Sequence, residues 1–148
     1  MAAYLHFFED ENTTLGMETK TSIQQQFGAV DIALNNLGTV KSGDALFLIG
    51  HGTPTDLSGY TPPTLAKLLT DNGLSQPVQI FLYSCDTGFG GAPYALELKI
   101  QLVQLKVLCT VLAPTGPIDS AFGVDTTSNK SFYGTGRLPQ VQKPSWVK

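Results

Sequence analysis

Two residues of the chain, His51 and Cys85, have side chains that together suit nucleophilic chemistry. A cysteine thiol is a strong nucleophile only as its thiolate, which a nearby imidazole base can generate. His51 follows the apolar run 45–49 after one glycine, and Cys85 follows the apolar run 80–83 after one serine. If the two runs are neighbouring parallel strands, both side chains leave the sheet at the same edge. The spacing therefore predicts a His–Cys pair at one sheet edge.

Acyl transfer at such a pair also requires backbone N–H groups that bind an oxyanion. Gly52 and the loop after Cys85 offer N–H groups that no bulky side chain covers. The neighbouring loop residues are candidates for contact with a substrate: Thr53, Asp86, Thr87 and Gly88. Asp86 fits a local hydrogen bond within a turn better than a specificity pocket for a basic side chain.

The order of residues along the chain excludes several enzyme classes. No histidine follows His51, whereas an α/β-hydrolase or a papain-like peptidase needs its histidine after the nucleophile. A cysteine phosphatase needs an arginine six positions after its cysteine, and Gly91 stands there. The glycine-rich stretch 88–91 fits neither a P-loop nor the dinucleotide fingerprint. A histidine followed by a cysteine on adjacent parallel strands remains.

Alternating strands and helices are predicted to position these residues. We expect strands over 2–8, 44–50, 78–83 and 107–112, and helices over 21–37, 61–73 and 92–106, with a hairpin-like and irregular tail over 118–148. Gly38 is the expected end of the first helix. Four apolar residues of the last helix are expected to face the core: Leu96, Ile100, Val103 and Leu105. The pattern predicts one α/β domain over 1–148.

Composition narrows the range of partners. Only 14% of the residues are charged, the net charge is −3, and Arg137 is the only arginine, so a nucleic-acid surface is not expected. The longest apolar runs are too short to cross a bilayer. The first residues lack the basic region of a signal peptide, which predicts a cytoplasmic protein or export by a route independent of such a peptide. Cys109 and His6 are expected to be structural, and the cysteines and histidines lack the spacing of a zinc site.

The segments Ile49-Gly50-His51-Gly52-Thr53-Pro54 and Tyr83-Ser84-Cys85-Asp86-Thr87-Gly88 resemble the caspase-like cysteine peptidases of clan CD. In that superfamily one apolar strand ends in His-Gly, and the next ends in a small residue before the catalytic cysteine. The resemblance covers roughly residues 40–116 and is nearest to the self-processing peptidase domain of RTX toxins. It implies a three-layer caspase-like sandwich, with a mainly parallel central sheet and helices on both faces.

By position, the resemblance makes His51 the general base and Cys85 the nucleophile, with Gly52 and the Cys85 backbone as the oxyanion hole. The expected function is a cysteine endopeptidase that cleaves protein substrates or itself, with neither metal nor organic cofactor. Activation by a protein partner or by self-association is expected. Inositol hexakisphosphate, which activates the RTX-toxin domain through a basic pocket, is not expected to act on a chain with one arginine. The alternative is a catalytically inactive caspase-like or flavodoxin-like module that binds a protein partner.

Overall fold

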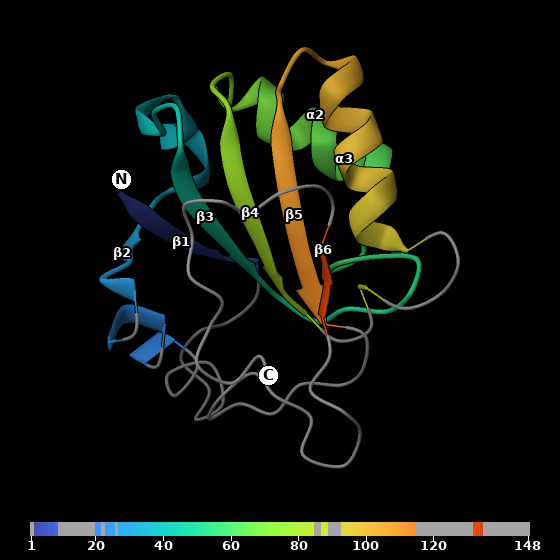
Figure 1. Ribbon diagram of the computed structural model, residues 1–148, viewed down its shortest axis with the longest axis horizontal. Coiled ribbons are helices and arrows are strands. Elements are labelled where there is room, and N and C mark those ends of the chain that lie inside the picture. Colours follow the sequence, from blue (N-terminus) through green and yellow to red (C-terminus); the bar gives the residue numbers. More distant parts are fainter. Residues whose placement is uncertain are drawn as a thin grey trace.

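The chain folds around a six-stranded sheet (Figure 1). The computed structural model describes residues 2–8, 20–21, 23–25, 27–84, 87–88, 93–114 and 132–134. The strands are β1 (Ala3–Phe7), β2 (Val30–Asp31), β3 (Asp44–Ile49), β4 (Val78–Tyr83), β5 (Cys109–Pro114) and β6 (Phe132–Gly134). The helices are the 3₁₀ helix η1 (Leu34–Thr39), α2 (Pro62–Asp71) and α3 (Tyr94–Gln104), and helical residues also occur between 20 and 27.

The strand order in the sheet is β2-β1-β3-β4-β5-β6. The first five strands in this order are parallel to their neighbours, and β6 pairs with β5 in the antiparallel direction. Strand β3 leads through α2 to β4, and β4 leads through α3 to β5, which is the strand–helix–strand alternation predicted from the sequence. The α/β class is therefore confirmed.

Two apolar clusters lie on opposite faces of the sheet. Every residue of β3 and β4 is buried, because side chains alternate between the two faces and both faces are covered. On one face Leu46, Leu48 and Ile80 pack with the apolar sides of α2 and α3. On the other face Phe47 and Phe81 stack with ring centroids 4.7 Å apart and pack with Phe27.

The prediction of a single helix over 21–37 is wrong. The helical residues end at Phe27, and Gly28 has a φ of +65°, a left-handed conformation that commonly ends helices. The Gly28 N–H donates to the Gln24 carbonyl oxygen at 2.9 Å, and the chain then forms β2 and η1. Gly38 lies inside η1 rather than at the end of an α-helix.

The prediction of which residues of the last helix face the core is also wrong. Helix α3 buries Tyr94, Ala95, Leu98 and Leu102, whereas Ile100, Val103 and Leu105 are 42%, 41% and 44% exposed. Apolar residues occupy so many positions of this helix that their spacing allows more than one inward face. The helix also starts at Tyr94 rather than at residue 92, and β5 starts two residues later than expected, at Cys109.

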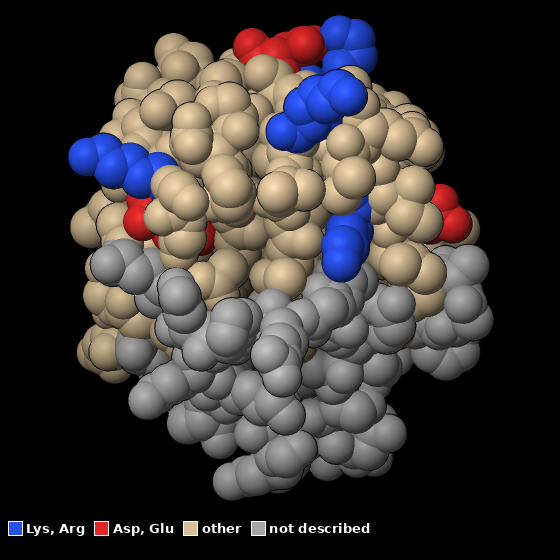
Figure 2. All heavy atoms as spheres, turned by 45° about the horizontal axis from the view of Figure 1, so that its top comes forward, with Lys and Arg blue, Asp and Glu red and all other residues tan. Residues whose placement is uncertain are grey.

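Charged side chains are sparse on the described surface. Figure 2 shows a few Lys side chains and a few Asp or Glu side chains on the described part of one face, some of them side by side, with uncharged atoms over most of the rest. No helix among the described residues is long and apolar enough to cross a membrane. Of the expected tail over 118–148, only the three residues of β6 are described.

Candidate active site

The candidate site lies where β3 and β4 end side by side. The two strands are parallel neighbours, and their last paired residues are Ile49 and Tyr83. His51 stands two residues beyond Ile49, and Cys85 stands two residues beyond Tyr83 in the sequence. The predicted adjacency of the two strands is confirmed. Cys85 and Asp86 lie outside the described residues, so the predicted pairing of the two side chains stays a prediction.

The segment 51–60 after β3 folds back on itself into a small hairpin that begins with His51. The N–H of Leu57 donates to the Tyr60 carbonyl at 3.0 Å, and the N–H of Tyr60 donates to the Leu57 carbonyl at 2.9 Å. Between them, Ser58 and Gly59 have φ values of 50° and 83°, which fits a two-residue type I′ turn. The side chain of Leu57 is fully buried and anchors the hairpin to the core.

The hairpin holds the backbone of His51 directly. The N–H of Ser58 donates to the His51 carbonyl oxygen at 2.7 Å, while the His51 residue as a whole is exposed. At Gly50, just before His51, a Cβ would collide with Ser58 Oγ and would lie in ordinary contact with Phe8 Cβ at 3.5 Å. Close packing with the Ser58 side chain therefore favours glycine at this position, just after the end of β3.

The Gly52 N–H is available as a donor. Gly52 forms an antiparallel bridge with Leu57, and the flanking hydrogen bonds run from Thr53 N–H to Asp56 O and from Ser58 N–H to His51 O. In such a pair the N–H groups of the two bridged residues point away from each other. Within the part of the chain that the structure describes, the Gly52 N–H donates to no acceptor. This arrangement suits the oxyanion role expected of Gly52.

Thr53 is exposed and stabilises the turn 53–56 that follows Gly52. Its hydroxyl oxygen accepts hydrogen bonds from the backbone N–H groups of Thr55 and Asp56 at 3.1 and 3.0 Å. A threonine that bonds to backbone two and three residues later stabilises a turn. The structure therefore gives Thr53 a local structural role within the hairpin, beside any contact with a substrate.

The segment after β4 is tied to its own strand end and to helix α3. Thr87 is fully buried, and its hydroxyl donates to the Ser84 carbonyl oxygen at 3.0 Å across the two residues between them. The Thr87 carbonyl in turn accepts the N–H of Ala95 at 3.0 Å. Thr87 is thus a structural residue of this loop, and Gly88 beside it is buried as well.

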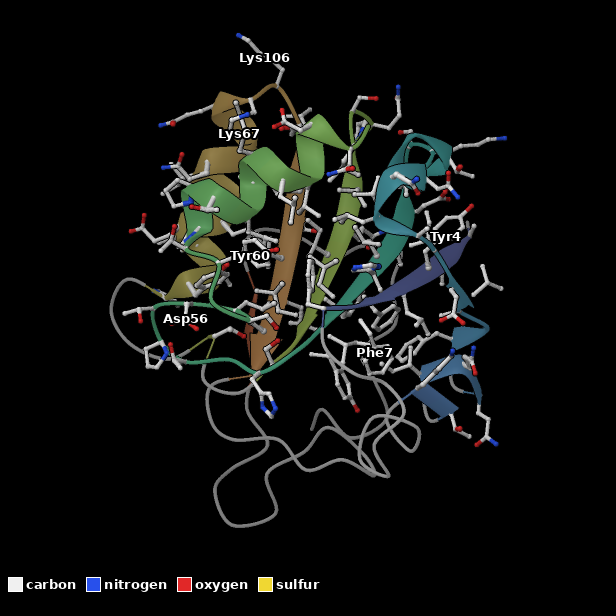
Figure 3. The ribbon with its side chains drawn as sticks, turned by 180° about the vertical axis from the view of Figure 1, so that it is seen from behind. Tyr4, Phe7, Asp56, Tyr60, Lys67 and Lys106 are labelled. Atoms are coloured by element: carbon white, nitrogen blue, oxygen red, sulfur yellow. The ribbon has the colours of Figure 1, made fainter. Side chains whose placement is uncertain are left out.

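Sequence reasoning missed Tyr94, the first residue of α3. Its hydroxyl donates to the Tyr60 carbonyl oxygen at 2.9 Å, at the base of the hairpin that carries His51. Figure 3 shows Tyr60 and Asp56 toward the end of the sheet where β3 and β4 finish, with Lys106 at the opposite end. Burial, with a smaller contribution from the Asp56 carboxylate, raises the pKa of the Tyr94 hydroxyl well above its usual value.

The remaining cysteine and histidine have structural surroundings. Cys109 is buried at the start of β5, and burial raises the pKa of its thiol from 9.0 to about 11, with a small opposing effect from Lys99. His6 Nδ1 donates to the Ile32 carbonyl at 3.0 Å, and its ring meets the Phe8 ring edge-on at 4.8 Å. Among the described residues, no group of three His, Cys, Asp or Glu side chains could hold a metal ion.

Comparison with known proteins gives no relative from which residue roles could be transferred. No model of a protein family matches the chain, and no curated protein matches it at a significant level. The roles of His51, Gly52 and Cys85 therefore depend on the geometry of the sheet edge and on the motif resemblance.

Proposed function

We propose that the protein is a caspase-like cysteine endopeptidase that uses His51 and Cys85 to cleave peptide bonds in protein substrates or in itself. The observation that supports this most is the parallel pairing of β3 and β4 up to Ile49 and Tyr83. It brings the ends of the two strands, each followed within two residues by a candidate catalytic group, to one edge of the sheet. Ligands of open α/β sheets bind at this edge.

In the proposed reaction, His51 takes the Cys85 proton and the thiolate attacks the carbonyl carbon of the scissile peptide. The N–H groups of Gly52 and Cys85 bind the resulting oxyanion. The carbon–nitrogen bond then breaks, and the leaving amine takes the proton from His51. A water molecule attacks the thioester and gives its proton to His51. The carbon–sulfur bond breaks, and the Cys85 thiolate is released.

The two cysteines of the chain provide an internal comparison for a test. With iodoacetamide at about pH 6, we expect Cys85 to be alkylated at least about tenfold faster than glutathione added to the same sample, because only an activated thiol is a thiolate at this pH. Cys109 is buried and its pKa is raised, so it should react slowly in either case and serves as the internal reference. Mass spectrometry of the digested sample measures these rates together. A peptide library incubated with the same protein should be cleaved. Alkylation of Cys85 no faster than that of glutathione, together with an uncleaved library, would refute the proposal.

The alternative is a module that binds a protein partner without cleaving it. Four exposed apolar residues close together in the sequence favour this reading: Ile100 and Val103 on α3, Leu105 at its end, and Leu108, which is 62% exposed. Exposed apolar side chains that gather on one surface are common at protein–protein contacts. A partner bound to these residues is equally compatible with the expected activation of a peptidase, so the alkylation experiment decides between the two functions.

A further inference from the structure

The first turn of α3 contacts both segments that carry the candidate catalytic residues. Tyr94 and Ala95 are consecutive. The Tyr94 hydroxyl donates to the carbonyl of Tyr60 at 2.9 Å, in the segment after β3. The Ala95 N–H donates to the carbonyl of Thr87 at 3.0 Å, in the segment after β4. One helical turn therefore joins two loops that are far apart in the sequence.

On the β3 side, the contact reaches His51 through a short series of hydrogen bonds. The carbonyl of Tyr60 accepts the N–H of Leu57 as well as the Tyr94 hydroxyl. Leu57 is bridged to Gly52, and the next residue, Ser58, donates its N–H to the His51 carbonyl at 2.7 Å. A displacement of Tyr60 would therefore move the hairpin that fixes the His51 backbone.

On the β4 side, the contact reaches the described residues that flank Cys85 and Asp86 in the sequence. The hydroxyl of Thr87 donates to the carbonyl of Ser84 at 3.0 Å, so the residues on either side of Cys85 and Asp86 are bonded to each other. Ala95 holds Thr87 from the helix. A displacement of the start of α3 would therefore move both ends of this short loop.

The Thr87–Ser84 contact is fully buried, and the Tyr94–Tyr60 contact is partly buried. Tyr94 is 1% exposed, and Leu57, Ser84 and Thr87 are fully buried. A hydrogen bond in such surroundings is costly to leave unmade, because water cannot replace the missing partner. The raised pKa of Tyr94 keeps its hydroxyl protonated, so it remains a donor at every pH at which a cysteine peptidase works.

From this geometry we infer that Tyr94 is a positioning residue. The first turn of α3 acts as a clamp (Tyr94 and Ala95) that sets the separation of the His51 and Cys85 segments, and so controls how readily His51 generates the Cys85 thiolate. The inference rests on the proposed function. It adds a control point that lies on the helix and outside the strand-end motifs.

The test compares Tyr94→Phe with Tyr4→Phe. Both substitutions remove one hydroxyl and keep the ring, and both rings pack against the same apolar cluster. Tyr4 lies on β1, well away from Tyr60 in Figure 3. The pH dependence of Cys85 alkylation is measured for both variants and the wild type, at a temperature where circular dichroism shows each to be folded. Peptide cleavage kinetics are measured alongside.

In Tyr94→Phe we expect the midpoint pH of Cys85 alkylation to rise by about one unit, which is about tenfold less thiolate below the midpoint. We also expect kcat to fall by roughly ten- to a hundredfold with little change in KM, since misplaced reacting groups slow the chemical step. Tyr4→Phe should match the wild type in both measurements. A purely structural role for Tyr94 would change the melting temperature and leave the alkylation profile of the folded protein unchanged.

The outcomes separate the two proposals. If the wild-type Cys85 is selectively reactive and Tyr94→Phe has the same alkylation profile, the clamp is refuted and the peptidase proposal stands. If the wild-type Cys85 shows no selective reactivity, the proposed function fails, and the clamp as a device for positioning a catalytic pair fails with it.

Discussion

Ile49 and Tyr83 form the last residue pair of the β3–β4 ladder, and the two strands end level with each other. Each strand is followed by one small residue, Gly50 or Ser84, and then by the candidate catalytic residue. Because the strands are parallel, this common end point puts both loops at the carboxyl edge of the sheet. The proposed chemistry depends on this register. If one strand shifted by two residues, the two loops would move apart along the strand direction by the length of two residues.

The first prediction concerns the catalytic pair. Cys85→Ala and His51→Ala should each abolish peptide cleavage, because residues that act as a unit lose nearly all activity on single removal. Both positions follow a strand, so circular dichroism should show an unchanged fold. Cys109→Ala is the matched control and should keep its activity at a stability cost of about 1 kcal/mol. Cleavage by a folded Cys85→Ala protein would exclude Cys85 as the nucleophile.

The second prediction concerns the close packing at Gly50. A Cβ at this position would collide with Ser58 Oγ, so Gly50→Ala should destabilise the protein by about 1–3 kcal/mol in urea unfolding. Removing the obstructing side chain should recover part of this loss. In a double-mutant cycle, Gly50→Ala and Ser58→Gly should therefore couple favourably by about 1 kcal/mol.

The cycle also separates the backbone effect of Ser58→Gly from the contact between the Ser58 side chain and residue 50. Ser58→Gly alone removes a side chain from a residue at a φ of 50° and therefore changes stability through the backbone. This effect is common to both arms of the cycle and cancels in the coupling. Additive free energies of unfolding would mean that Ser58 does not restrict the side chain at Gly50.

Much of the fold could be predicted from local sequence. The expected strand over 78–83 has the bounds of β4, since its six buried residues lie between a proline and a serine. The helix α2 was predicted from Pro62 and Pro63 at its start and from Gly73 beyond its end. In both cases the residues at the ends of the element have backbone preferences of their own, so the pattern needs no tertiary information.

The errors came from positions where packing decides between local alternatives. The apolar spacing over 21–37 continues past Gly28, and only the observed φ of +65° shows that this glycine ends the helix. In α3, apolar residues occur on more than one side, and the core contact with Leu98 and Leu102 selects the buried face. Periodicity alone cannot make that selection.

The strand ends at the candidate site could be predicted from the sequence, but the hydrogen bonds that hold the loops after them could not. His51 and Cys85 follow continuous apolar runs, which is a local signal. The bond from Tyr94 to Tyr60 joins residues 34 positions apart, and one partner is a backbone carbonyl, which every residue type possesses. No feature of the sequence marks such an acceptor, so the role of Tyr94 required the three-dimensional structure.

The third prediction concerns Gly73, at the end of α2. It has a φ of +107°, and a Cβ there would lie 2.8 Å from the backbone nitrogen of Gly38. Gly28 has a φ of +65° with nothing within 4 Å of the corresponding Cβ. Gly28→Ala should therefore cost about 1 kcal/mol through the backbone alone, and Gly73→Ala should cost clearly more, because backbone atoms must also move. Equal free energies of unfolding for the two variants would contradict the close approach of Gly73 to Gly38.

The last prediction concerns the pH dependence of stability at Cys109. Burial raises the pKa of its thiol from 9.0 to about 11 in the folded protein. Below pH 9 the thiol is protonated in both folded and unfolded chains, and its contribution to stability is fully present. As the pH rises from 9 to 11, the unfolded chain releases the proton more readily, so the folded state loses stability.

Cys109→Ala should therefore lose less stability than the wild type between pH 9 and pH 11, measured by urea unfolding at fixed pH. Tyr94, whose pKa is also raised by burial, and Cys85 are present in both proteins, so their titration cancels in the difference. Alkylation gives a second readout, since Cys109 should react only when the protein unfolds. Parallel stability curves for the two proteins over this pH range would show that the Cys109 thiol titrates equally in the folded and unfolded states.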